Sequence, residues 1–156
     1  MLIKAVFVMI LFVTAIGFST PSGVNVIGIK NIMITRSNAT GLSSLLVAEQ
    51  SFIQMNNTLP SLIDWKSDLR STRSVIPNFA PYDISYNEES LMGRYFCLTA
   101  TSPNADHVEM FLDIAERIDH LDPIVAEDCG DTDNSTLNAS EWLSEDDINI
   151  TIFTGN

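Results

Sequence analysis

Apolar residues are concentrated in one uninterrupted run near the N-terminus. Residues 5–18 contain no charge and one hydroxyl group, and Lys4 precedes them. A positive residue followed by an apolar run is typical of a secretory signal peptide. The run is shorter than the roughly 20 residues of a straight membrane-spanning helix. The pattern therefore predicts either a cleaved targeting signal or a short membrane anchor.

The next region has a less regular pattern. Pro21 and Gly23 predict a break in any helix, because proline lacks an amide donor and glycine costs backbone entropy. Residues 24–35 are rich in apolar and β-branched side chains, but their spacing fits neither a helix nor a strand, so their structure stays open. Residues 37–41, Ser-Asn-Ala-Thr-Gly, predict a turn or a helix start, which argues against one unbroken helix here.

An amphipathic helix is predicted from Leu42 to Met55. Its apolar positions fall on one stripe, formed by Leu42, Leu45, Leu46, Phe52 and Ile53. Glu49 lies within that stripe, and we expect its carboxylate to reach solvent at the helix edge, because charged residues are rarely buried without partners. Residues 56–60, Asn-Asn-Thr-Leu-Pro, predict the end of the helix.

The remaining chain predicts a mixture of loop, strand and helix. Residues 61–90 predict an irregular surface loop with one short helix near 62–69. Residues 94–101 and 123–126 predict strands, and residues 148–153 alternate apolar and polar, which predicts a closing strand with one buried face. After a start at Ser102-Pro103-Asn104, residues 105–121 predict an amphipathic helix with one apolar face, formed by Val108, Phe111, Leu112, Ala115 and Ile118.

Charge is unevenly distributed along the chain. The sequence has 20 acidic and 8 basic residues, a net charge of -12, and 17 of the acids lie from Asp83 onward. Phosphate neutralisation needs surface lysine and arginine. The acidic C-terminal half is therefore not expected to bind nucleic acid.

Cys97 and Cys129 are the only cysteines. In an exported protein a lone pair most simply forms a disulfide, and closing a loop of this size should stabilise the fold by roughly 3–4 kcal/mol. Two buried free thiols are the alternative.

Residues that could carry chemistry are few. His107 and His120 are the only histidines and have no third nitrogen or sulfur ligand, so no metal site is predicted for them. The acidic loop around residues 128–134 lacks the EF-hand pattern, which leaves a solvated loop or a weak calcium site. No nucleophile signature or phosphate-binding loop occurs, so the chain is predicted to be a non-enzyme without a cofactor.

Asn-x-Ser/Thr sequons provide candidate glycosylation positions, whose use depends on the host. They begin at Asn38, Asn56, Asn134, Asn138 and Asn149.

Taken together, this layout resembles that of the type IV pilin-like proteins. An apolar N-terminal segment comes first, then an amphipathic continuation, an Asn-Asn-Thr-Leu-Pro exit at residues 56–60, and a two-cysteine region near the C-terminus. The chain lacks the Gly-Phe-Thr-Leu-Ile-Glu start of ordinary pilins. The resemblance is therefore to a divergent or minor pilin.

The resemblance implies an α+β fold, in which an N-terminal helical stem, broken near Pro21, packs on a small antiparallel sheet with one further amphipathic helix and one disulfide. Residues 1–23 would anchor the chain, residues 24–55 would continue the stem, and residues 56–156 would form an acidic head. The assembly positions that it implies in the stem are Val6, Phe7, Ile10, Leu11, Val13 and Phe18.

The function implied is structural. The subunit would insert in a membrane and then self-associate, or join other pilin-like subunits, in a filament at the cell surface that mediates adhesion. The alternative is a small secreted or periplasmic binding domain with a cleaved signal peptide.

Overall fold

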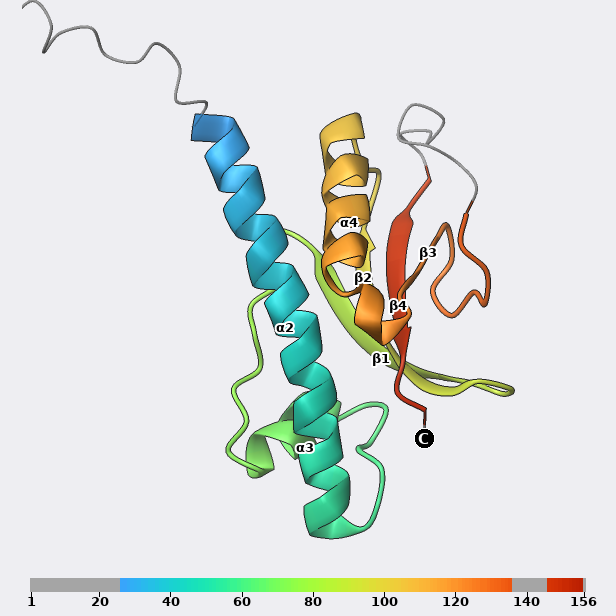
Figure 1. Ribbon diagram of the computed structural model, residues 1–156. Helices are drawn as coiled ribbons and strands as arrows, with labels where there is room; N and C mark the ends of the chain where they lie inside the picture. Colours follow the sequence, from blue (N-terminus) through green and yellow to red (C-terminus); the bar gives the residue numbers. More distant parts are fainter. Residues whose placement is uncertain (1–25, 136–145, 156) are drawn as a thin grey trace, which may run out of the picture. The chain divides into compact units, whose positions relative to one another are not determined.

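The computed structural model describes residues 26–135 and 146–155 of the chain. The chain divides into two compact units, residues 1–31 and residues 32–156, and the packing described below is that of the second unit. Its α+β fold confirms the predicted class (Figure 1). The elements are α2 (Val26–Asn56), α3 (Trp65–Ser71), β1 (Asp83–Glu89), β2 (Gly93–Ala100), α4 (Ala105–Arg117), the 3-10 turn η1 (Asp119–Leu121), β3 (Ile124–Ala126) and β4 (Ile148–Phe153).

The four strands form one antiparallel sheet in the order β1-β2-β4-β3. Strand β4, the last in sequence, pairs with β2 on one side and with β3 on the other. Cys97 lies opposite Thr151 in this register, and Val125 lies opposite Ile150. The predicted strands at 94–101, 123–126 and 148–153 are thereby confirmed.

Helix α2 runs unbroken through residues 37–41, so the predicted turn is wrong. The hydroxyl of Ser43 donates to the carbonyl of Ala39 at 3.1 Å, which satisfies this polar side chain within the helix. Gly41 is required for packing, because a Cβ there would lie 2.9 Å from the Phe79 ring and 3.1 Å from Pro77 Cβ. The glycine thus permits a close approach of the 77–79 segment to a continuous helix.

The core lies between the helices and one face of the sheet. On α2, Leu42, Leu45 and Phe52 of the predicted stripe are buried. Helix α4 begins after Asn104, whose side chain accepts a hydrogen bond from the His107 amide at 2.9 Å. The predicted apolar positions Val108, Phe111 and Ile118 are buried, whereas Leu112 is 39% exposed. Met110 and Ile114 are buried as well, although they were not predicted.

Two strand predictions need correction. Residues 83–89 form β1. An irregular structure was expected there, because this polar sequence has only two apolar side chains, Ile84 and Tyr86. Strand β4 was expected to bury one face, but both faces are buried: Asn149 and Thr151 are 3% and 1% exposed. The disulfide-bonded segment after β3 contacts the second face, as described below.

Candidate functional site

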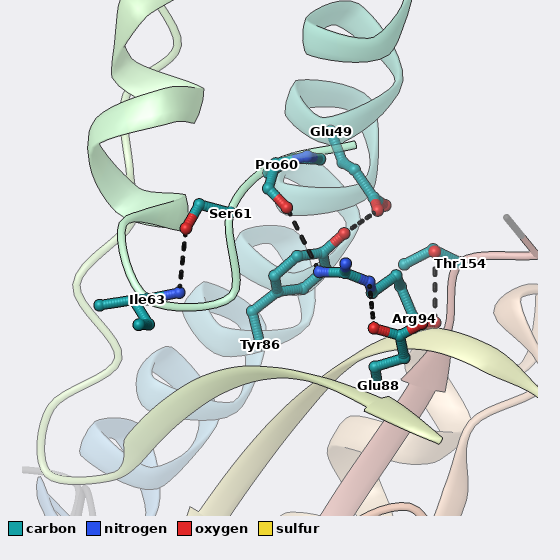
Figure 2. A network of polar contacts seen from close by, with 8 residues as sticks. All are labelled: Glu49, Pro60, Ser61, Ile63, Tyr86, Glu88, Arg94 and Thr154. Carbon is teal, nitrogen blue, oxygen red and sulfur yellow. Dashed lines mark hydrogen bonds and ion pairs between the residues drawn. The ribbon is translucent and has the colours of Figure 1, made fainter. Parts of the chain in front are cut away.

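A buried polar network joins α2 to the sheet at Glu49, and Figure 2 shows it from close by. Glu49 is 0% exposed, so the prediction that its carboxylate reaches solvent is wrong. It lies four residues after Leu45 and seven after Leu42, which places it on the buried face of the helix. The Tyr86 hydroxyl of β1 donates a hydrogen bond to Glu49 Oε1 at 2.5 Å. One oxygen of the buried carboxylate therefore has a specific partner.

Arg94, near the start of β2, supplies the positive charge of this network. Its Nε lies 3.2 Å from Glu88 Oε2, and its guanidinium carbon lies 5.6 Å from the centroid of the Tyr86 ring. Its Nη1 donates to the carbonyl of Pro60 at 3.3 Å, and its own carbonyl accepts bonds from the amide and hydroxyl of Thr154 (Figure 2). The network thus fastens the segment after α2 and the end of β4 to one point of the sheet.

The surroundings of the Glu49 carboxyl and the Tyr86 hydroxyl favour the protonated, neutral form of both groups. Burial raises the pKa of Glu49 above its ordinary 4.5, while the hydroxyls of Tyr86 and Thr154 and the charge of Arg94 lower it by smaller amounts. Burial also raises the pKa of Tyr86, as do its bond to Glu49 and the charge of that carboxylate. Tyr86 therefore stays protonated and acts as a donor, so the arrangement serves to hold α2 on the sheet.

We expect the Glu49→Gln substitution to stabilise the protein increasingly as pH rises from about 4.5. A raised folded-state pKa means that the folded chain binds more protons than the unfolded chain, so wild-type stability falls with rising pH in this window, by up to about 1.4 kcal/mol per pH unit. Glutamine can accept the Tyr86 bond without titrating.

The measurement is urea unfolding of wild type and variant from about pH 4 to pH 8. Glu116→Gln, which removes an exposed carboxylate on α4, is the matched control for the loss of one negative charge. A Glu49→Gln profile parallel to that of wild type would contradict the expectation.

The Cys97–Cys129 disulfide is present, with sulfur atoms 2.04 Å apart, as predicted. It joins β2 to the segment after β3. Asn149 Oδ1 accepts from the Thr99 hydroxyl at 2.6 Å, and Asn149 Nδ2 donates to the Glu127 carbonyl at 2.6 Å. The Gly130 amide donates to the Thr151 hydroxyl at 3.0 Å. This segment therefore covers the face of the sheet that α2 leaves free.

The glycosylation candidates separate by exposure. Asn38 and Asn149 are 2% and 3% exposed, so a glycan on either is incompatible with this fold, and these two predictions are corrected. Asn56 and Asn134 are exposed. Asn134 Oδ1 already accepts a bond from the Val125 amide at 2.7 Å. Asn138 lies outside the described residues.

The two candidate metal sites were the histidines and the acidic loop at residues 128–134. Neither forms a ligand cluster, because within residues 26–135 and 146–155 no three His, Cys, Asp or Glu side chains are placed to hold an ion. The His107 ring contacts Tyr82 edge-on, with centroids 5.9 Å apart. Asp128, Asp131 and Asp133 are exposed on the loop after β3.

The six assembly positions predicted in the stem, between Val6 and Phe18, lie outside the described residues. In the described part of the chain no helix is both long and apolar enough to cross a membrane.

Sequence signals could have revealed the buried polar site only in part. Glu49 was visible within an apolar stripe, but its partner Tyr86 is 37 residues away, in a segment where no strand was predicted.

Comparisons with known proteins add no identification, because no family model, no curated protein and no solved structure matches this chain.

Proposed function

We propose that this chain is a structural subunit of a type IV pilus-like filament, which assembles through its apolar N-terminal helix and presents an acidic head to solvent. The proposal includes membrane insertion before assembly and a cell-surface location afterwards. The proposal rests on the order of two segments along the chain: the apolar run at residues 5–18 comes first, and the long helix α2 follows it.

The observation that carries the proposal is the length and exposure of α2. This helix has 31 residues, and its buried positions begin at Thr35. Near its start, Ile29 and Ile32 are 47% exposed and Met33 is 68% exposed. An apolar surface of this kind is typical of a contact with a partner. The apolar run at residues 5–18 precedes it in sequence, as a filament-forming stem requires.

Sheet, disulfide and helix order agree with such a subunit. A long helix packs on a four-stranded antiparallel sheet, and the Cys97–Cys129 bond closes the C-terminal region. The head carries most of the acids, so its surface is well solvated.

A secreted or periplasmic binding domain is the second candidate. It is favoured by a surface depression of about 460 Å³ lined by Arg36, Ala39, Thr40, Ser43, Arg117 and Ile118. A small anion would be the ligand class for such a depression, because Arg36 and Arg117 border it.

The test introduces charges at the exposed apolar positions of α2. Filaments are sheared from cells that express the full chain and are identified by electron microscopy and mass spectrometry. Ile32→Asp with Met33→Asp should abolish filaments that contain the chain, since a buried charge without a partner is costly at an interface.

Leu91→Asp is the control, because Leu91 is 89% exposed and belongs to the β1–β2 turn and not to α2. It should leave assembly intact. Filaments that form equally with the stem variant, or surface fibres that never contain the wild-type chain, would refute the proposal.

A further inference from the structure

Helix α3 carries a basic stripe formed by Lys66, Arg70 and Arg73. Lys66 and Arg70 lie one turn apart on one side of the helix, Arg73 follows the C-cap with a φ of 64°, and all three are exposed. Trp65 and Leu69, which are 6% and 0% exposed, anchor the other side in the core. The three cations form no ion pair with any carboxylate of residues 26–135 or 146–155.

Helix α4 carries an acidic stripe formed by Asp106, Glu109, Asp113 and Glu116. Their spacing of i, i+3, i+7 and i+10 also gathers them on one side, opposite the buried Val108 and Phe111. Only Asp113 has a cation partner in the described part of the chain, Arg117 Nη2 at 3.3 Å. Like charges three and four residues apart disfavour a helix. Each stripe would therefore gain from a partner of opposite charge.

We propose that the basic stripe of one copy docks along the acidic stripe of a second copy. Lys66 and Arg70 are about 6 Å apart along α3 and the four acids span about 15 Å of α4 at a rise of ~1.5 Å per residue, so the acidic stripe is long enough to cover the basic one. The two stripes lie on different elements, so the contact joins unlike surfaces, and it propagates from copy to copy where no two-fold axis closes it. This inference rests on the proposed filament function and assigns one of its head-to-head contacts.

A second copy fits the basic stripe better than a nucleic acid or an anionic membrane. A nucleic acid or an anionic membrane offers no positive group to the acidic stripe, whereas a second copy carries both acidic and basic side chains. A second copy supplies four acids in one row on α4. Complementary rows of this kind steer association and fix its register.

The first experiment is zero-length carbodiimide cross-linking of the full chain in detergent micelles, with a mixture of isotope-labelled and unlabelled copies. Lys66 is the only lysine after Lys30, so its products are unambiguous by mass spectrometry. We expect bonds between copies from Lys66 to Glu109, Asp113 or Glu116. These bonds should disappear at 1 M salt, where the screening length falls to about 3 Å.

Matched variants separate this contact from general charge effects. Arg70→Gln with Arg73→Gln should lower the yield of cross-links from Lys66 to α4 of another copy roughly tenfold. Gln54→Glu with Thr132→Glu, at exposed positions outside both stripes, changes the net charge equally and should leave the yield unchanged. In the swapped variant R70E/R73E/E109K/E116K the net charge is that of wild type, and cross-links between positions 70 and 109 or 116 should appear.

The outcomes distinguish the two proposals. Filaments that contain the chain but show no Lys66 bond to α4 of another copy would overturn the stripe contact and leave the filament function standing. Cross-linked stripes without filaments would support the contact and count against the filament. A basic stripe that instead binds phosphatidylglycerol vesicles, with no bond between copies, would overturn the contact in favour of lipid.

Discussion

Replacing both cysteines, Cys97→Ala with Cys129→Ala, is expected to lower the free energy of unfolding by about 3–4 kcal/mol. The bond closes a loop with a sequence separation of 32, so its loss enlarges the unfolded ensemble. The loop also holds polar partners of β4, since Asn149 donates to Glu127 and Gly130 donates to Thr151. Loosening the loop would expose the side chains of Asn149 and Thr151 on the sheet to water.

The measurement is urea unfolding followed by circular dichroism at neutral pH. Thr132→Ala, at an exposed position of the same loop, is the control and should change the stability by less than about 0.5 kcal/mol. A loss below about 1 kcal/mol for the double variant would show that the loop is held mainly by its hydrogen bonds, contrary to the expectation.

Phe96→Ala is expected to cost about 3–5 kcal/mol, because it empties a large volume at the centre of the core. Phe96 is 1% exposed, and its ring contacts two aromatic neighbours, with centroids 4.7 Å from Tyr86 and 5.5 Å from Trp65. Those neighbours belong to β1 and α3. The substitution should therefore weaken the attachment of α3, and with it the position of the basic stripe.

Two further substitutions make this test specific. Phe96→Leu keeps most of the volume and should cost less than about 1.5 kcal/mol. Leu91→Ala, at an 89% exposed site, should have almost no effect. Equal stability of wild type and Phe96→Ala in urea unfolding would contradict the described core.

Several elements could be predicted because their signals are local. The α4 pattern repeats at the helical period and begins with the Asn104 cap, and β2 and β4 are rich in aromatic and β-branched side chains. The disulfide followed from the number of cysteines and the predicted export. The helix and the two strands are thus specified largely by neighbouring residues, whereas the disulfide followed from there being only two cysteines to pair.

The errors arose where distant contacts override local preference. Residues 37–41 have turn-forming side chains, yet Gly41 allows Phe79, 38 residues later, to pack against a continuous helix. Glu49 is buried because Tyr86 and Arg94 come to it from two strands. Asn149 was taken as a glycosylation candidate, although its amide bonds to the disulfide loop. None of these partners is visible in the local sequence.

The buried polar network and the proposed function are linked through α2. A filament stem transmits force to the head only if its helix is fixed to the sheet. Glu49, Tyr86 and Arg94 join α2, β1 and β2 at one point, and the apolar stripe of α2 adds the surrounding core. A buried hydrogen bond also favours one register of the helix over others, which a continuous apolar face does not.

The central claim is that the apolar N-terminal segment remains part of the working protein. The most direct measurement is the N-terminal residue and intact mass of the chain isolated from its native source. We predict a chain that keeps residues 5–18 and is found in membranes or filaments. A soluble, monomeric chain that begins between Phe18 and Gly23 would contradict the filament proposal and leave the secreted binding domain.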